Sequence, residues 1–368
     1  MLTAAGLIFI GLVVLVIGGE LLVRGASKLA ALAGISPLVI GLTVVAFGTS
    51  APELAVSLKA SFGGEPEIAV GNVIGSNIFN VLFILGISAL VTPLVVSSQL
   101  IRFEVPLMVG VSVLTWLLCL NGVLGRAEGI ILFLSLLIYI TWTVIQSRRE
   151  TKAVQEEFAE EYEHPPKSTL GIVLQFVWIA LGLVGLAFGS DWLVDGAVII
   201  ATSLGMSELL IGLTIVAAGT SLPEVVASVI ASIKGERDIA VGNVVGSNLF
   251  NLMCVLGLTA AVVPEGVRIP ETAVWQEMLV MIGVAALCLP IFLTGSRIDR
   301  WEGCLLLGYY VLYTTYLVLA ATASPWAPPL AAISLYGLIP LTVVVLLVSV
   351  LVDRRKKQSG ADGSTTTG

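Results

Sequence analysis

Long apolar runs, separated by short hydrophilic or Pro- and Gly-containing breaks, cover most of the chain. A run of about 18 or more such residues is long enough to cross the hydrocarbon of a bilayer as one helix. Eleven runs reach this length, at approximately residues 3–22, 36–62, 67–91, 104–121, 127–146, 170–190, 206–233, 238–263, 274–293, 302–322 and 330–352. The pattern predicts an all-α polytopic membrane protein.

Composition supports lipid as the solvent. Hydrophobic residues make up 57% of the 368 residues and charged residues only 12%, against roughly 45–50% and about 25% in ordinary globular proteins. Nucleic-acid binding, secreted disulfide scaffolds and cytosolic enzymes are excluded, because the charge and polar surface they need are missing. The four cysteines lie in apolar stretches without metal-ligand spacing, which is typical of buried packing residues.

The positions of the basic residues predict the orientation, because loops on the cytoplasmic side carry the excess of Lys and Arg. With the N-terminus outside, 15 of the 18 basic residues fall on the inside, and only Lys59, Arg126 and Arg268 fall outside. The first run lacks a basic segment before it and a small-residue cleavage site after it, so we expect it to stay as a helix. We therefore expect a multi-pass protein of the cell (inner) membrane with a cytoplasmic C-terminus.

An internal repeat organises the chain. Residues 41–80 and 212–251 are identical at 26 of 40 positions, in one gapless register at an offset of 171 residues. Five spans separate equivalent helices, and an odd number inverts the second copy in the membrane. The sequence thus predicts ten core helices in two inverted five-helix halves, residues 1–146 and 170–322, an arrangement that secondary transporters use with a midplane site. A cytoplasmic loop (147–169), an eleventh helix (323–352) and a disordered cytoplasmic tail (353–368) complete the prediction.

A helix-breaking motif with a glutamate lies in the middle of one apolar span in each half. The motif residues are Gly48, Thr49, Ser50, Pro52 and Glu53 in the first half, and Gly219, Thr220, Ser221, Pro223 and Glu224 in the second. Proline lacks an N–H and crowds the carbonyl four residues earlier, so each helix must kink or break. Freed carbonyls inside a membrane need a partner such as a bound ion. Beside a carboxylate they predict a cation site.

The following span of each half adds a polar stripe. Asn72, Ser76 and Asn80 recur every four residues, as do Asn243, Ser247 and Asn251, so each triplet lies on one helical face. Asn77 and Asn248 are turned from that face by roughly 100°. We expect these two to hold neighbouring helices together through hydrogen bonds.

The two intramembrane glutamates have a structural alternative, as neutral acids that hydrogen bond within the protein, because charge at the bilayer centre costs at least about 2.5–3.5 kcal/mol. Their duplication beside helix breakers and hydroxyls favours function. Calcium takes 6–8 oxygen ligands, often carboxylates and backbone carbonyls. Sodium can use the same oxygens, and competition for one site is the physical basis of antiport.

With these two motifs, the sequence resembles the sodium/calcium exchanger family of the cation/calcium antiporter superfamily. The resemblance implies that Glu53 and Glu224 share a calcium ion with the carbonyls of Thr49 and Thr220, and that Asn80 and Asn251 face the centre. Many relatives have Asp at the position of Asn251, so potassium co-transport is not expected. The residues implied to line flanking sodium sites are Ser50, Ser76, Ser221 and Ser247, with the carbonyls of Ala46 and Ala217. The residues expected to support the site are Pro52, Pro223, Asn72, Asn243, Gly48 and Gly219.

The sequence therefore predicts a sodium/calcium antiporter that works by alternating access, with no resident cofactor and with the two ions and the lipid bilayer as its partners. The first and sixth helices are expected to move past a rigid core through small residues such as Gly18 and Gly189. One chain is expected to suffice for transport, and assembly into a homo-oligomer is also compatible with the sequence. Two alternatives remain, a proton/calcium or other divalent-cation antiporter and an acid-protease dyad. The acidic loop around His164 is expected to be a solvated face.

Overall fold

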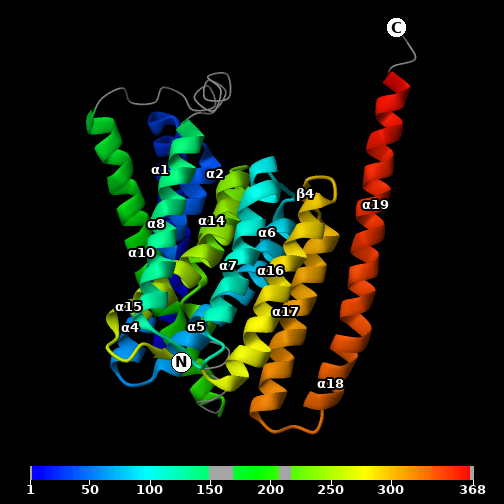
Figure 1. Ribbon diagram of the computed structural model, residues 1–368. Helices are drawn as coiled ribbons and strands as arrows, with labels where there is room; N and C mark the ends of the chain where they lie inside the picture. The colour runs from blue at the N-terminus through cyan, green and yellow to red at the C-terminus, as the bar shows by residue number, and fades with distance from the viewer. Residues whose placement is uncertain (1, 149–168, 207–216, 365–368) are drawn as a thin grey trace.

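The computed structural model describes residues 2–148, 169–206 and 217–364 and is built almost entirely from helices (Figure 1). In these residues, 9 helices are long and apolar enough to cross a membrane, and a bent pair of helices makes a tenth candidate. This confirms the predicted all-α polytopic fold. The predicted span 206–233 falls partly outside the described residues, and its described part includes the apolar helix Leu222–Ile233.

The first half begins with one long helix and continues through shorter helices, π-helical segments (η) and two short strands. Its elements are α1 (Leu2–Ala33), α2 (Pro37–Ile40), η1 (Gly41–Val45), α3 (Ala46–Thr49), α4 (Ala51–Phe62), α5 (Pro66–Phe79), η2 (Asn80–Leu85), α6 (Gly86–Val91), β1 (Leu94–Val95), η3 (Leu100–Glu104), α7 (Val105–Leu118), β2 (Val123–Leu124) and α8 (Arg126–Arg148).

The second half repeats this order. Its elements are α10 (Thr169–Ser203), α12 (Ala217–Gly219), α13 (Leu222–Ile233), α14 (Arg237–Phe250), η5 (Asn251–Leu256), α15 (Gly257–Val262), β3 (Val267–Arg268), η6 (Ala273–Glu277), α16 (Met278–Leu293), β4 (Arg297–Ile298) and α17 (Arg300–Ala321). The elements that follow are α18 (Ala327–Ile333), η7 (Ser334–Leu338) and α19 (Ile339–Ser364).

The longest helices, α1 with 32 residues and α10 with 35, start the two halves and pack against each other. Both extend well beyond the predicted spans 3–22 and 170–190, because they continue past charged residues that end the apolar runs. Their backbones approach closely at glycines. A Cβ on Gly18 would lie 2.8 Å from the backbone nitrogen of Leu186, and one on Gly189 would lie 2.8 Å from that of Leu15.

The predicted helix break is present in both halves. The helices Pro37–Thr49 and Ala51–Phe62 meet at an angle of 41°, and the residue between them, Ser50, has φ −83° and ψ 3°. Ser221 has nearly the same backbone angles, φ −92° and ψ 6°, between α12 and α13. In both α4 and α13 the proline stands in the first turn, where its missing N–H would have no partner within the helix in any case.

The helices after the broken ones form the centre of the molecule. The span Arg237–Val262 is fully buried over its most apolar window, and the equivalent span Pro66–Val91 is 78% buried. Each contains a π-helical segment that starts at an asparagine of the polar stripe, Asn80 or Asn251. Such segments are rare and often mark functional sites.

Two short antiparallel ribbons join the halves. Strand β1 pairs with β4, and β2 pairs with β3. Because one membrane span separates β1 from β2, the ribbons lie at opposite ends of the bundle. Each end is thus tied by backbone hydrogen bonds between elements that are far apart in the chain.

Helices α18 and α19 follow the two halves and stand at the edge of the bundle (Figure 1). Only 6% of the most apolar window of Ala327–Val352 is buried inside the protein. The predicted disordered tail from residue 353 differs from the structure, in which α19 continues to Ser364. Each added residue extends a helix that is already formed, so the free-energy cost of nucleating a new helix is not incurred. The C-terminal end of α19 and the N-terminal end of α1 lie at opposite ends of the molecule in Figure 1.

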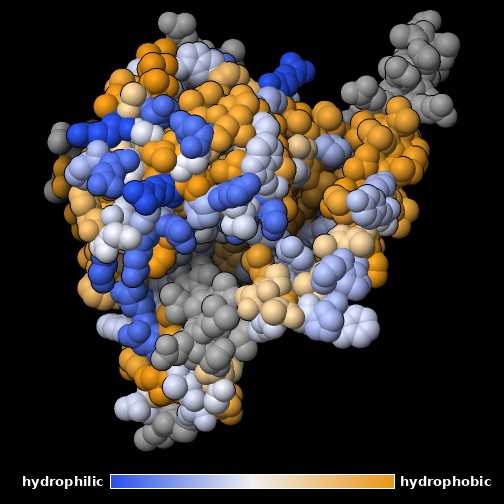
Figure 2. All heavy atoms as spheres, turned by 60° about the horizontal axis from the view of Figure 1, so that its bottom comes forward, coloured by the Kyte–Doolittle hydropathy of each residue, from blue (hydrophilic) through white to orange (hydrophobic). Residues whose placement is uncertain are grey.

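The surface divides as a membrane protein requires. Figure 2 shows hydrophilic residues gathered on the end of the molecule that is lower in Figure 1, while hydrophobic residues cover much of the flank. Large apolar side chains such as Phe9, Ile138 and Val344 are more than half exposed on the outer helices. In water such a surface would be unstable, whereas in a bilayer it faces lipid.

Candidate cation-binding site

The two predicted glutamates lie in the interior of the core, with 0% and 1% of Glu53 and Glu224 exposed. Each stands in the first turn of the second part of a broken helix, α4 or α13. The positive end of a helix dipole favours a carboxylate at that position. The break therefore places each acid at the positive end of a helix inside the core.

Hydrogen bonds across the two halves bring the glutamates to one site. The hydroxyl of Ser221 donates to Oε1 of Glu53 at 3.1 Å, and the hydroxyl of Ser50 donates to Oε1 of Glu224 at 3.2 Å. Each serine thus binds the acid of the opposite half, although the two residues lie 168 and 174 positions apart in the chain.

The first asparagine of each polar stripe orders the broken helix beside it. The side-chain amide of Asn72 donates to the carbonyl of Glu53 at 3.1 Å and to the hydroxyl of Ser57 at 3.0 Å. Asn243 makes the equivalent bonds to Glu224 at 3.4 Å and Ser228 at 2.9 Å. These bonds fix the backbone at each glutamate.

The threonines complete this network across the halves. The hydroxyl of Thr49 donates to Oδ1 of Asn243 at 3.1 Å, and that of Thr220 donates to Oδ1 of Asn72 at 3.5 Å. Thr49 is buried and Thr220 is half-buried. The two halves therefore share one polar network that follows the sequence repeat.

A second crossed arrangement lies further along the central helices. Asn80 donates to Oδ1 of Asn248 at 3.1 Å, and Asn251 donates to Oδ1 of Asn77 at 3.0 Å. The prediction that Asn77 and Asn248 hold helices together is confirmed. The side-chain oxygens of Asn77 and Asn248 accept the amide groups of Asn251 and Asn80. The side-chain oxygens of Asn80 and Asn251 are therefore available to bind a cation.

Five buried side-chain oxygens at this site have no hydrogen-bond donor among the described residues. These atoms are Oε2 of Glu53, Oε2 of Glu224, Oδ1 of Asn80, Oδ1 of Asn251 and Oγ of Ser247. Four of them form two pairs related by the repeat. A buried acceptor without a partner costs about 1–3 kcal/mol, and more when it is charged. Such a set of oxygens fits a hard cation, which accepts electron pairs from oxygen and supplies the missing positive charge.

No basic side chain neutralises the acids within the described part of the chain, where the ion pairs involve neither Glu53 nor Glu224. The same residues contain no group of three or more His, Cys, Asp and Glu side chains that could hold a metal. The site therefore has two carboxylates supplemented by hydroxyls, amides and carbonyls. This donor set suits calcium or sodium better than a transition metal.

The predicted carbonyls differ in their surroundings. The carbonyl of Ala46 accepts the backbone N–H of Ser50 at 3.0 Å and the hydroxyl of Thr49 at 3.4 Å. The carbonyl of Gly219, which Pro223 cannot bind, accepts the hydroxyl of Ser190 at 2.6 Å. The backbone of Ala217 begins α12. Ser76 also belongs to the network, because its hydroxyl accepts that of Ser221 at 3.1 Å.

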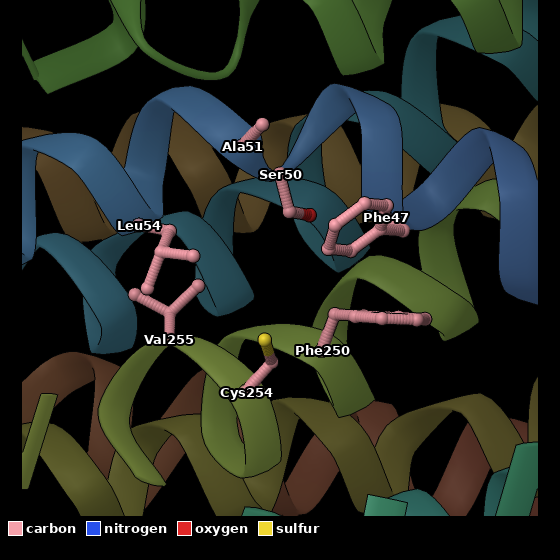
Figure 3. Close-up of a pocket in the computed structure, with 7 residues that line it drawn as sticks. All are labelled: Phe47, Ser50, Ala51, Leu54, Phe250, Cys254 and Val255. Carbon is pink, nitrogen blue, oxygen red and sulfur yellow. The ribbon is translucent and has the colours of Figure 1, made fainter. Parts of the chain in front are cut away.

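A small crevice lies beside Ser50 (Figure 3). It is lined by Phe47, Leu54, Phe250 and Cys254, among others. The residue equivalent to Cys254 in the first half is Phe83, which packs against Phe79 with 4.7 Å between ring centroids. The smaller cysteine side chain leaves space next to one of the two crossed serines.

Sequence patterns did not reveal two buried groups. Glu104 is fully buried and accepts the hydroxyl of Tyr139 at 2.5 Å and the amide of Gln99 at 2.8 Å. It stands near the end of an apolar run, where an acid is usually exposed. Ser190 occupies the position equivalent to Gly19, and this departure from the repeat was the available signal.

Two inverted halves, each with a broken helix that carries a buried carboxylate to a common oxygen-rich site, define a secondary transporter for cations. The sodium/calcium exchanger protein family matches residues 3–145 and 174–319. The chain belongs to this family of cation/calcium antiporters, which are transporters and not enzymes.

Similarity to individual proteins extends over nearly the whole length of each. CaxA of Alkalimonas amylolytica is 41% identical over 318 residues, which are 85% of this chain and 98% of that protein. The inner membrane protein YrbG of Escherichia coli (strain K12) is 37% identical over 318 residues, covering 86% and 97%. A solved structure of the sodium-calcium exchanger NCX_Mj, soaked with 10 mM Na⁺ and zero Ca²⁺, has a TM-score of 0.73, with 30% identity over 84% of this chain and 97% of that one.

Proposed function

We propose that this protein exchanges sodium for calcium at the site between the two broken helices. The observation that carries the proposal is the pair of crossed, buried glutamates whose free oxygens face no basic partner among the described residues. Calcium is held by Glu53 and Glu224, with the carbonyls of Thr49 and Thr220. The flanking oxygens that receive sodium are those of Ser50, Ser76, Ser221, Ser247, Ala46 and Ala217, with Asn80 and Asn251 at the centre.

Antiport follows from the charge at this site. The two carboxylates require a bound cation before the site can be closed to both membrane faces, because a buried unpaired charge is strongly unfavourable. Either one calcium ion or several sodium ions supply that charge. The long helices α1 and α10 slide against the core and expose the loaded site to one face at a time. Both glutamates belong to one chain, which supports a single chain as the transporting unit.

The distribution of basic residues supports an N-terminus outside and a cytoplasmic C-terminus in the inner membrane. The N-terminal end of α1 and the C-terminal end of α19 lie at opposite ends of the molecule, which is consistent with this orientation (Figure 1). A fluorescent protein that folds only in the cytoplasm, fused after Gly368, is expected to be bright. A dark fusion, together with activity of a periplasmic reporter at the same position, would reverse the orientation.

Isotope uptake into proteoliposomes tests the proposed exchange. Calcium uptake is measured with sodium, potassium and proton gradients imposed one at a time at fixed voltage. We expect only an outward sodium gradient to drive uptake. Uptake driven by the proton gradient alone would instead support the proton/calcium antiporter, since a buried carboxylate can accept a proton in place of a metal.

Substitution of the glutamates connects this activity to the site. Glu53→Gln or Glu224→Gln is expected to lower calcium uptake about 100-fold or more, because removing one partner of a buried charged pair costs about 3–5 kcal/mol. Glu67→Gln, an exposed acid in the first turn of α5, is the matched control and should transport normally. Wild-type uptake by either buried variant would refute the assignment of the site.

A further inference from the structure

Helices α1 and α10 cross the core next to both broken helices, but their polar contacts with the two are not equivalent. The repeat would allow the same contacts on each side, because residues at an offset of 171 occupy equivalent places. In the described residues, one hydrogen bond joins these long helices to α12 and one ion pair joins them to the C-terminal end of α13, whereas the contact that they make with Gly48 of α3 is apolar.

The first polar contact is made by Ser190 of α10. Its side chain is buried, and its hydroxyl donates to the carbonyl of Gly219 at 2.6 Å. This carbonyl would normally accept the N–H of the residue four positions later, which is Pro223 and has none. Ser190 therefore supplies the donor that the helix break removes, two residues from the hydroxyl that binds Glu53.

The equivalent position in the first half cannot do the same. It is Gly19, and a Cβ there would lie 2.6 Å from the side chain of Ile230 and 2.9 Å from that of Val226. The equivalent carbonyl belongs to Gly48, whose own α-carbon faces the side chain of Leu183, 2.5 Å from the position a Cβ would take. Gly19 thus faces α13, to which Ile230 and Val226 belong, and the side chain of Leu183 on α10 is the contact that Gly48 makes with a long helix. The long helices therefore meet Gly48 through an apolar side chain and Gly219 through a hydroxyl.

The second polar contact joins α1 to the end of α13. Nζ of Lys234 lies 2.5 Å from Oε1 of Glu20, with 27% and 41% of these side chains exposed. The equivalent residues are Asp191 and Gly63, so the mirror position has an acid but no cation to pair with it. Both polar contacts thus bind the long helices to the same broken helix.

We propose that Ser190 is a positioning residue that couples the movement of α10 to the half of the site that carries Glu224. This proposal rests on the proposed function, in which α10 is one of the moving helices. When α10 slides, the bond from Ser190 to Gly219 breaks and the backbone beside Ser221 and Glu224 changes. The half that carries Glu53 has no such hydrogen bond, and the long helix moves past it along apolar side chains. The two membrane faces are therefore inequivalent although the glutamates are related by the repeat.

Hydrogen–deuterium exchange of the purified full chain tests the link without any transport. In Ser190→Ala, backbone amides of residues 217–226 are expected to exchange about tenfold faster, because a buried carbonyl loses its donor. The mirror segment, residues 46–55, should be unchanged and serves as the internal control. Ser190→Thr keeps a hydroxyl and should restore slow exchange. Equal exchange in wild type and Ser190→Ala, or an equal increase in both segments, would overturn the proposal.

Transport provides the second measurement. The half-saturating calcium concentration is determined from each face of oriented proteoliposomes. In Ser190→Ala the ratio of the two values is expected to change about fivefold, because the lost hydrogen bond stabilises only one of the two access states. Ser112→Ala, which removes a buried hydroxyl bonded within α7 to Met108, should leave this ratio unchanged. A purely structural effect would change both values equally and would overturn the coupling role. If wild-type protein moves no calcium, the proposed function fails, and hydrogen exchange still decides the role of Ser190.

Discussion

The crossed serine–glutamate bonds make each carboxylate depend on the opposite half of the chain. Ser50 and Ser221 stand at equivalent breaks, and each hydroxyl binds one oxygen of an acid while the other oxygen stays without a donor. When a hydrogen bond holds one oxygen of a carboxylate, the direction in which the second oxygen points is also fixed. This is the preorganisation that a cation needs in order to bind with little loss of side-chain entropy.

Removal of one crossed hydroxyl should therefore weaken calcium binding without abolishing it. Ser221→Ala is expected to raise the half-saturating calcium concentration about 5- to 30-fold, which corresponds to about 1–2 kcal/mol for a hydrogen bond to a charged group. Calcium-dependent uptake at a series of concentrations measures the shift. Ser61→Ala is the matched control, because the hydroxyl of Ser61 is buried but has no partner among the described residues. An unchanged half-saturation in Ser221→Ala would show that this bond does not orient Glu53.

The acids also affect the stability of the protein when no cation is bound. Two buried carboxylates without basic partners repel each other, so replacing one with a neutral amide should stabilise the calcium-free protein. Glu224→Gln is expected to raise its melting temperature by a few degrees, about 1 kcal/mol, and to remove the further increase that calcium causes in wild type. Thermal unfolding in detergent with a chelator and then with calcium measures both. A lower melting temperature for the calcium-free variant would contradict this account.

At the scale of elements, the broken helices hold the residues of the site in place, whereas the glycine-packed helices α1 and α10 are the ones proposed to move. The breaks in α3–α4 and α12–α13 bring a serine and a glutamate of each half to the site, and the asparagines of α5 and α14 bind the backbone beside them. By contrast, α1 and α10 contact each other through glycine backbones, which present a smooth surface. Small residues allow this close approach within a membrane.

A methyl group in this smooth contact should slow transport. In Gly18→Ala the added Cβ would lie 2.8 Å from the nitrogen of Leu186 and 2.9 Å from the oxygen of Gly182, and such overpacking costs about 1–3 kcal/mol. We expect an initial rate about tenfold lower, with helicity retained. Gly6→Ala, on the same helix but with nothing within 4 Å of the added atom, should transport at the wild-type rate. A normal rate for Gly18→Ala would show that α1 and α10 do not need this contact to move.

At the scale of the whole molecule, every residue of the candidate site lies in the two halves that precede α18, and two β ribbons tie these halves together at both ends. Helix α19 contributes little to this unit. It packs against α16, with Leu346 buried, and the hydroxyl of Tyr309 on α17 lies 2.6 Å from that of Thr342. The family match also ends before it, at residue 319.

Truncation after Thr322 should therefore preserve transport. We expect the shortened chain to retain calcium uptake within about twofold per molecule, because lipid can replace a helix that buries so little surface. Uptake is normalised to the amount of folded protein recovered from the membrane. Loss of uptake by a truncated chain that is still folded and inserted would assign α18 and α19 a role in the transport cycle.

The sequence by itself determined the architecture and the main chemistry. Apolar length is a local property, so the spans could be predicted, although α1 and α10 proved longer than their apolar runs. The repeat and its odd number of intervening spans determined the inversion. The proline, glycine and glutamate of each motif determined the breaks, because a missing N–H acts on its own helix regardless of the rest of the fold.

Only the tertiary structure decided which groups meet. The bonds from Ser50 to Glu224 and from Ser221 to Glu53 join residues of opposite halves, and helical spacing carries no information about such pairs. For the same reason the burial of Glu104 and the partner of Ser190 could not be predicted. A repeat predicts symmetry, whereas Ser190, Cys254 and Lys234 replace residues of different size or charge in the first half. Their effects depend on packing between distant segments, and packing is determined by the folded molecule as a whole.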